Sequence, residues 1–353
     1  MNFNIDFSFL RRVTSKDKAF FARQLSTMLA SGLPLNRAIL ILAQQERTPT
    51  FKRVLDAIQE DLEAGASFST AIAKHPEVFD RVFVNIVVSG ETVGQLAEVL
   101  ERLADQLGKD TEFTSKVKGA FAYPAFIFIA MVIVAGIMMV YIVPQLQQVF
   151  LDANANLPLT TRTIIALSSF LKSFWWVVIA VLVIVYLLGR TYLQSKNGRR
   201  LSDQIQLRLP GGIGQEIYLT RFTRTLGTLI QAGTPIIEAL NVTAAAVNNS
   251  YYEDVLKQAV QEVKRGVPLS SPVNAHPELF PSIVSQMVLV GEQTGQLDKI
   301  LLSLAEYYES EVDTKLKAIS SLVEPVVIVV IGIAVGFLVY SILVPIYNIA
   351  QLS

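Results

Sequence analysis

The feature that most constrains this chain is an internal repeat. Residues 21–145 match residues 222–346 at about 31 of 125 positions, without a gap and at a constant offset of 201 residues. Unrelated segments match several times less often, so the chain contains a duplication. Each copy starts with a polar stretch and ends with an apolar one that two prolines bracket. We therefore expect two equivalent modules, each followed by an apolar span.

The polar part of each copy has the periodicity of α-helices. Leu96, Leu100, Leu103 and Leu107 follow at spacings of four, three and four residues, which places them on one face of a helix. No comparable run alternates with a period of two, so we predict a bundle of about six helices for each module. The helices we expect in the first copy start near residue 15, run over about 35–45, 51–64 and 79–89, surround residues 75–76 briefly, and end with a long helix from near residue 94.

Three apolar stretches are long enough to cross a membrane. Residues 121–143 and 325–347 each hold 23 residues without a charge, and about 20 span the hydrocarbon core. Residues 174–189 are fewer, but their aromatic and leucine neighbours extend them, and Lys172 and Arg190 can reach the headgroups. The sequence thus predicts an all-α integral membrane protein with two homologous cytoplasmic helical-bundle modules and three transmembrane helices.

The distribution of lysine and arginine gives the orientation. The segment between the first two spans, about 145–173, holds only Arg162 and Lys172, whereas the sides that carry the modules are richer in these residues. We therefore expect both modules and the N-terminus in the cytoplasm, and the short loop and the C-terminal tail outside. Trp175 and Trp176 would lie at the outer interface. The residues that carry this bias are Lys109, Lys116, Lys118, Arg190, Lys196, Arg199, Arg200, Lys315 and Lys317.

These assignments divide the chain into nine segments. The expected segments are an N-terminal tail (1–16), module 1 (17–118), the first transmembrane helix (119–144), an outer loop (145–170), the second transmembrane helix (171–193), a linker (194–216), module 2 (217–320), the third transmembrane helix (321–347) and an outer tail (348–353). We interpret the alternating Phe3, Ile5, Phe7 and Phe9 as part of a mobile tail that docks elsewhere.

Composition and motifs exclude several classes of function. The chain has no cysteine and a net charge of zero, so it offers no thiolate chemistry and no global attraction for nucleic acid. No GxxxxGK[ST] loop is present, and the glycines at 211, 212 and 214 follow a proline rather than a strand. The two histidines, His75 and His276, each precede a proline and have one glutamate nearby, too few ligands for a metal site. We expect neither catalysis nor a cofactor.

The sharpest local signal is a motif repeated in both copies, GExxGQL. Its glycines permit a tight turn between helices, and its glutamate, in or beside a first helical turn, would suit the helix dipole. We expect a structural role, with partner contact as the alternative. A glycine–proline turn also recurs, as does an arginine that we expect to pair with the motif glutamate or to face a partner. The candidate residues are Arg23, Gly32, Pro34, Gly90, Glu91 and Gly94, with their counterparts Arg224, Gly233, Pro235, Gly291, Glu292 and Gly295.

Glu324 is the one acid that adjoins a span, where the first copy has Tyr123. Acids at membrane depth are functional suspects by default, but one at the edge can also reach the headgroups. Both interpretations stay open. The four prolines at 124, 144, 325 and 345 are expected to mark span ends and kinks rather than a gate.

The repeated FxRxLxTxxxxGxP, HPExF and GExxGQL elements, each ahead of a proline-bounded span, resemble the inner-membrane platform proteins of type II secretion and type IV pilus machines. The resemblance covers about residues 17–350. It implies a non-enzymatic bacterial inner-membrane protein and a homo-oligomer, a dimer or larger. The implied partners are a hexameric cytoplasmic ATPase, pilin or pseudopilin subunits, other inner-membrane assembly proteins and membrane lipid. Many members carry more than the 16 residues found here before the first module, which leaves any ATPase contact of that segment in doubt.

Two other classes of function remain as alternatives. Secondary transporters also contain parallel repeats, but three spans with few polar groups leave little for a substrate path. A membrane-anchored receptor or scaffold would need an outer domain, and the outer segment here has only about 30 residues. A flux assay in proteoliposomes would separate a transporter from a platform protein.

Overall fold

The computed structural model describes residues 13–152 and 159–350, and in this part of the chain the regular elements are all helices. The chain forms two compact units. Unit 1 contains the residues up to Ser115 together with Ser202–Asp313, and unit 2 contains Lys116–Leu201 and the residues from Thr314 onward. Unit 1 therefore holds most of both repeats, and unit 2 holds the apolar spans. The all-α class with two repeats and three long apolar helices is confirmed.

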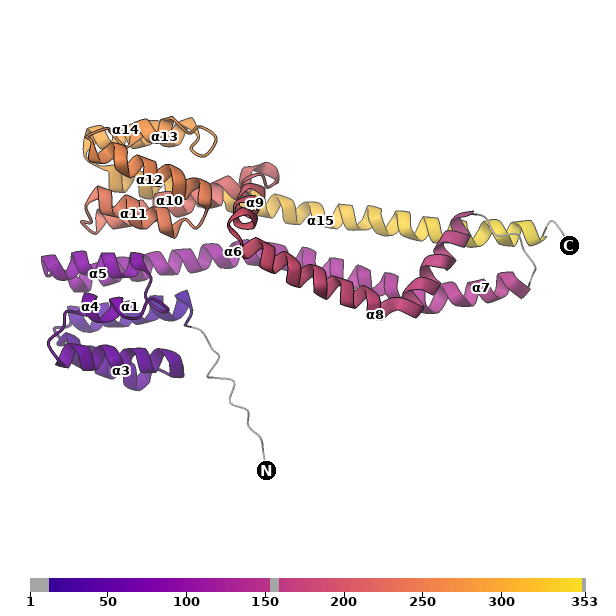
Figure 1. The fold of residues 1–353 in the computed structure, drawn as a ribbon, viewed down its shortest axis with the longest axis horizontal. Helices are drawn as coiled ribbons and strands as arrows, with labels where there is room; N and C mark the ends of the chain where they lie inside the picture. Colours follow the sequence, from indigo (N-terminus) through magenta and orange to yellow (C-terminus); the bar gives the residue numbers. More distant parts are fainter. Residues whose placement is uncertain (1–12, 153–158, 351–353) are drawn as a thin grey trace, which may run out of the picture. The chain divides into compact units, whose positions relative to one another are not determined.

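Module 1 contains the helices that the glycine and proline positions predicted. The helix expected over 35–45 runs from Leu35 to Gln45, and the one expected near 51–64 runs from Pro49 to Glu63. Thr14 and Asp17 form a capping box at the first helix, which satisfies its free N–H groups. The helices are α1 (Ser15–Ala30), α2 (Leu35–Gln45), α3 (Pro49–Glu63), α4 (Phe68–Ala73), α5 (Arg81–Val93) and α6 (Leu96–Ile137) (Figure 1).

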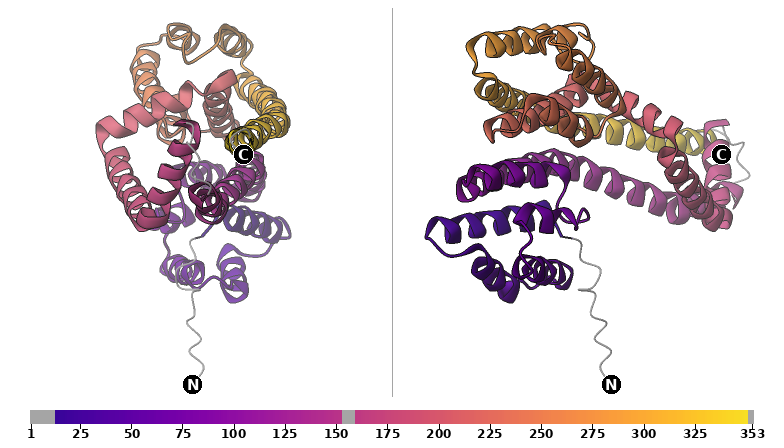
Figure 2. Two further views of the ribbon diagram at one scale, coloured as in Figure 1. Left: turned by 90° about the vertical axis from the view of Figure 1, so that its right-hand side faces the viewer. Right: turned by 60° about the vertical axis from the view of Figure 1, so that its left-hand side comes forward.

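Module 2 repeats this order, and the segment before it is also helical. The expected linker over 194–216 contains a twelve-residue helix and one 3-10 turn rather than extended chain. Figure 2 shows the two modules as separate bundles within unit 1, indigo to purple and orange. The helices are α9 (Lys196–Leu207), η3 (Pro210–Gly212), α10 (Ile213–Gln231), α11 (Ile236–Ala246), α12 (Ser250–Lys264), α13 (Ser270–Asn274), α14 (Ser282–Thr294) and α15 (Leu297–Ala350).

Equivalent aromatic side chains fill the two module cores. In module 1, Phe21 lies 5.5 Å from Phe51 between ring centroids and 5.8 Å from Phe79. The counterpart of Phe51 is Tyr252, which is completely buried, and its hydroxyl donates a 2.7 Å hydrogen bond to the Leu279 carbonyl. The hydroxyl that Tyr252 has and Phe51 lacks is thus hydrogen-bonded, as a buried polar group needs to be. Burial raises the pKa of the Tyr252 hydroxyl well above its ordinary value.

Unit 2 contains three helical segments long and apolar enough to cross a membrane, among the described residues: Leu96–Gln145, Lys172–Leu193 and Leu297–Ile333, the first and third of which start in unit 1. The first includes a π-helical turn, η2 (Met138–Ile142), that ends two residues before Pro144. A proline ring clashes with the carbonyl four residues earlier in an α-helix. A local π turn widens the helix at that point and accommodates the ring.

The segment expected as an outer loop, 145–170, is largely helical. It contains most of α7 (Val143–Asp152) and the start of α8 (Leu159–Gln194). Phe174 interrupts α8 with φ −122° and ψ 21°, and the apolar stretch of α8 starts at about this kink. The apolar segment of α8, Lys172–Leu193, lies within the range 171–193 assigned to the second transmembrane helix, and a helix precedes it where a loop was expected. The tail residues Phe3 to Phe9 lie outside the described residues.

Candidate functional site

The motif glutamates hold the start of a neighbouring short helix. The carboxylate of Glu91 accepts hydrogen bonds from the backbone N–H groups of Phe68, at 2.7 Å, and Ser69, at 3.0 Å. In module 2, Glu292 accepts from the N–H groups of Leu269 and Ser270. These N–H groups have no partner within their own helix, and a negative charge is favourable there. Glu91 and Glu292 themselves lie in the last turns of α5 and α14, and their carboxylates lie beside the first turns of α4 and α13.

The motif glycines make the turn that follows. Gly94 and Gly295 end α5 and α14 in the left-handed conformation, with φ of 74° and 67°, which residues with a Cβ adopt at a cost. Gly90 serves a different purpose. A Cβ at Gly90 would lie 2.8 Å from the Cβ of Val99, so glycine allows α5 and α6 to pack closely. The motif is therefore built into the fold of each module.

The glycine–proline turns are equally regular. Gly32 and Gly233 both have φ of 84°. The N–H groups of Leu33 and Thr234 reach back to the carbonyls of Met28 and Leu229, at 3.1 and 2.9 Å, in the pattern of a Schellman motif. Pro34 and Pro235 then precede the next helix.

The two arginines are paired inside the protein, but not with the motif glutamates, so that part of the prediction was wrong. Arg23 contacts Asp105, and its Nη1 lies 3.8 Å from Glu101 Oε1. The side chain of Arg23 is 42% exposed. Arg224 is buried and contacts Glu309, with its Nη1 3.4 Å from Asp110 Oδ1. Glu91 and Glu292 are instead hydrogen-bonded to the start of α4 and α13.

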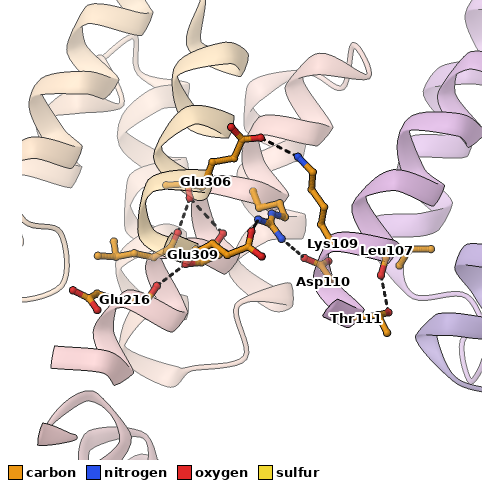
Figure 3. Close-up of polar contacts among 11 residues, drawn as sticks. Leu107, Lys109, Asp110, Thr111, Glu216, Glu306 and Glu309 are labelled. Carbon is orange, nitrogen blue, oxygen red and sulfur yellow. Dashed lines mark hydrogen bonds and ion pairs between the residues drawn. The ribbon is translucent and has the colours of Figure 1, made fainter. Parts of the chain in front are cut away.

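The pairing of Arg224 with Asp110 belongs to a polar contact between the modules, since Asp110 lies on α6 and Arg224 on α10. Beside it, the Nζ of Lys109 lies 2.9 Å from Glu306 Oε1 on α15 (Figure 3). Arg102 donates to the Gln231 carbonyl at 2.9 Å. The hydroxyls of Ser89 on α5 and Thr234 lie 3.1 Å apart. The α5/α6 face of module 1 thus packs against α10 and α11 of module 2.

A cavity of about 420 Å³ lies along this contact. Its wall includes Gln106, which is 6% exposed and whose Oε1 accepts no hydrogen bond within the described part of the chain. Asp110 also faces it. Burial raises the pKa of the Asp110 carboxyl above its ordinary value of 3.8, against the opposing effect of the Arg224 charge. Desolvation therefore outweighs the ion pair at this carboxyl.

The histidines make local contacts. His75 Nδ1 lies 3.4 Å from Glu77 Oε1, and His276 Nδ1 lies 2.9 Å from Glu278 Oε1. The nearby helices α4 and α13 each end two residues before the histidine. Among the described residues, no group of three or more histidine, cysteine, aspartate or glutamate side chains could hold a metal ion.

In unit 2, Glu324 is exposed on α15, next to Pro325. An apolar hollow of about 350 Å³ lies nearby, between α6 and α15, and its wall includes Pro124, Phe128 and Leu322. Ser320 donates a hydrogen bond of 3.3 Å to the Ala120 carbonyl. The two repeat-equivalent helices thus meet just before their apolar stretches.

The sequence did not reveal the acids that pair with the arginines. Asp105, Asp110 and Glu309 lie on long helices rich in charge, where no spacing distinguishes them from solvated residues. Comparison of the repeats offered one signal for an acid that pairs with arginine. Glu101 and Asp105 are four residues apart, and Asp105 has an acidic counterpart, Glu306. Gln106 also stands out, since its counterpart is Tyr307.

Comparison with protein families matches both repeats to one family model, type II secretion system protein F. The matched ranges are residues 21–144 and 222–345, and they keep the offset of 201 residues that the sequence repeat has. The duplication predicted from the sequence is therefore confirmed.

Several curated proteins are similar over nearly the whole chain. The type IV pilus assembly protein PilC of Thermus thermophilus is 38% identical over 336 residues, which cover 95% of this chain and 82% of that protein. PilC of Pseudomonas aeruginosa is 33% identical and covers 97% and 92%. The type II secretion system protein F of Pseudomonas aeruginosa is 29% identical and covers 98% and 85%.

Proposed function

Because the chain belongs to the type II secretion system protein F family, we propose that it is the non-enzymatic membrane platform of a type IV pilus or type II secretion machine. In this role it couples a cytoplasmic hexameric assembly ATPase to the insertion of pilin or pseudopilin subunits into the growing fibre. The names of its relatives, type IV pilus assembly protein PilC and type II secretion system protein F, support the assignment to such machines.

One structural observation carries the coupling role. The helices α6 and α15 each begin inside a packed module and continue without a break into an apolar span. Because one run of backbone hydrogen bonds joins each module to its span, movement of a module would be passed to the span along this helix. The sequence has no P-loop of its own, and energy would therefore enter through protein contact on the modules.

The protein is a multi-pass membrane protein, as its three apolar helices and its family indicate. We place it in the bacterial inner membrane with its N-terminus and both modules in the cytoplasm. The bias of lysine and arginine toward the module side supports this orientation. The nine segments proposed from the sequence are kept, with helices now assigned within the outer loop and the linker.

The proposed partners are the ATPase, the pilin or pseudopilin, other inner-membrane assembly proteins, membrane lipid and further copies of the chain. The two modules offer far more surface than the 20–30 residues a side that a standard interface needs. Within the spans, we assign Glu324 to a charge on the pilin, because it is an exposed acid beside an apolar helix. The repeated motif residues, Gly90, Glu91, Gly94 and their counterparts, are assigned a structural role.

Co-purification tests this function. The full chain would be extracted from membranes in mild detergent and captured by a tag. The assembly ATPase and the major pilin of the same machine would then be detected in the eluate. We expect both partners to be retained. As a control, the same tagged chain is captured from cells that lack the ATPase gene. The amount of pilin retained there shows whether pilin binds without the ATPase.

Loss of both partners from the intact, folded protein would overturn the proposal. A flux of solute through proteoliposomes that contain the chain alone would instead favour the secondary transporter. Retention of an outer ligand without either partner would favour the receptor or scaffold.

A further inference from the structure

The contact between the two modules is one-sided, which leaves one matching face free on each. Module 1 uses its α5/α6 face, and module 2 uses its α10/α11 face together with the flank of α15 that carries Glu306. The repeat gives each face a counterpart on the other module, namely α14/α15 in module 2 and α1/α2 in module 1. Within the described residues, the helix pairs in substantial contact do not include α14 with α1 or α2. The contact is therefore heterologous rather than two-fold.

Burial confirms that the counterpart faces are uncovered. In module 2, Thr228, Ala232 and Thr234 are buried against module 1, whereas their counterparts Thr27 and Ser31 are exposed and Leu33 is half-buried. On the other side, Gln106 is 6% exposed but its counterpart Tyr307 is 48% exposed. Val290, the counterpart of the half-buried Ser89, is 44% exposed. The α14/α15 face thus carries apolar side chains without cover, and the α1/α2 face carries exposed hydroxyl side chains beside the half-buried Leu33.

The free faces are also complementary in chemistry. Moving the four internal contacts by one repeat gives the pairs that would form between the free faces, and two of the four keep a match. The ion pair of Asp110 with Arg224 becomes Glu311 with Arg23, which again joins an acid to an arginine. The contact of Ser89 with Thr234 becomes Val290 with Leu33, which joins two apolar side chains. Of the other two, Lys109 with Glu306 would become Ser310 with Asp105, and Arg102 would be replaced by Ser303. Two of the four contacts thus keep complementary chemistry on the free faces.

We propose that the α14/α15 face of one chain docks on the α1/α2 face of a second copy, in the same geometry as the internal contact of the modules. The first face consists of Ile283, Met287, Val290, Tyr307 and Glu311, and the second consists of Arg23, Thr27, Ser31, Leu33 and Ile41. This inference deepens the homo-oligomer of the proposed function by giving it an interface. Copies that share one membrane and one orientation are related by rotation about its normal, so head-to-tail contacts of this kind form a ring if that rotation closes.

Because the chain contains no cysteine, introduced cysteines can test this interface cleanly. The variant Val290→Cys/Leu33→Cys would be oxidised in native membranes and analysed by non-reducing electrophoresis. We expect bands at multiples of the chain mass. Ser89→Cys/Thr234→Cys is the positive control, since its hydroxyl oxygens lie 3.1 Å apart within one chain, and it should give a bridge without covalent oligomers.

Leu289 supplies a matched negative control. It is 43% exposed and adjacent to Val290, but its counterpart Val88 remains 41% exposed at the internal contact. Leu289→Cys/Leu33→Cys should therefore cross-link at least about fivefold less. Crosslinking of Val290→Cys alone as efficiently as the pair would overturn the proposal, because it indicates a two-fold α14 contact. Capture of another protein by Val290 in place of a second copy would also overturn it.

A second measurement does not depend on disulfide geometry. Val290→Glu should raise the dissociation constant of the detergent-solubilised oligomer by about tenfold or more, and Leu289→Glu should leave it within about twofold. Light scattering after size-exclusion chromatography gives both values. Equal effects of the two variants would refute the interface. Retention of ATPase and pilin by the wild type is scored separately, so a failed interface and a failed platform function remain distinguishable.

Discussion

At the scale of single residues, two arginines at equivalent positions of the repeat form different kinds of ion pair. Arg23 and Arg224 are equivalent in sequence, but Arg23 is 42% exposed at the side chain and Arg224 only 4%. Arg224 compensates Asp110 and Glu309, which come from different modules. Burial thus separates a surface ion pair from a buried one, and the two differ in their effect on stability.

We expect Arg224→Gln to lower the free energy of unfolding by about 2–4 kcal/mol, because it leaves two partly buried carboxylates without their cation. Arg23→Gln should cost less than about 1 kcal/mol. Thermal unfolding of the detergent-solubilised chain, followed by circular dichroism, compares the two. Equal shifts in Tm would mean that Arg224 is not the buried anchor.

Asp110 predicts a pH dependence. Burial raises its pKa above 3.8, so the folded protein binds this proton more tightly than the unfolded chain does. The stability that the protonated carboxyl contributes is therefore full below 3.8 and is lost as pH rises through the raised value. Asn cannot ionise, so the Tm of Asp110→Asn relative to wild type should increase as pH rises from about 3.8. A difference that stays flat or falls would contradict this.

Glu324 belongs to the same scale. If it meets a charge on the pilin, Glu324→Gln should reduce fibre assembly by about tenfold or more while the protein still reaches the membrane. Immunoblotting of sheared fibres and of membrane fractions measures both. Tyr123→Phe, at the equivalent position of the first copy, is the control. Normal fibre yield from Glu324→Gln would leave Glu324 with a headgroup role.

At the scale of helices, glycine positions decide how closely α5 and α6 approach. Gly90 on α5 faces Val99 on α6 directly. A Cβ at Gly108, which is on α6, would meet nothing within 4 Å. Gly90→Ala should destabilise the fold by about 1–3 kcal/mol because α6 must move. Gly108→Ala should stabilise it by about 0.5–1 kcal/mol, since alanine is the better helix former. Chemical denaturation of the solubilised chain gives the sign of each effect, and the same sign for both would contradict the argument.

The bounds of helices could be read from the sequence where glycine and proline punctuate it. The helix over 35–45 was predicted to the residue because Gly32, Pro34 and the apolar pattern agree. The helix α9 was missed because its polar sequence, with Gly198, has the composition of a linker. The partners of Arg23, Glu91 and their counterparts could not be predicted, since a side chain's partner depends on how helices pack, and spacing along one helix does not contain that information.

At the scale of the whole molecule, the two modules belong to one compact unit. We therefore expect them to move together when the ATPase acts. Locking them with the Ser89→Cys/Thr234→Cys bridge should leave fibre assembly within about twofold of the reduced form. Assembly under oxidising and reducing conditions, with the Cys-free parent as control, measures this. Loss of assembly that a reductant restores would show that the modules must separate.

The one-sided contact between the modules also bears on how the duplicated halves can be exchanged. Their cores share aromatic positions, since Phe21 and Phe79 in one correspond to Phe222 and Phe280 in the other. Their faces are not, because Ser89 and Gln106 are matched to Thr234 and Thr228, whereas Val290 and Tyr307 are not. Exchanging core residues between the modules would therefore disturb them less than exchanging the surface residues of the contact between the modules. The two modules thus differ in their surface residues according to their order along the chain.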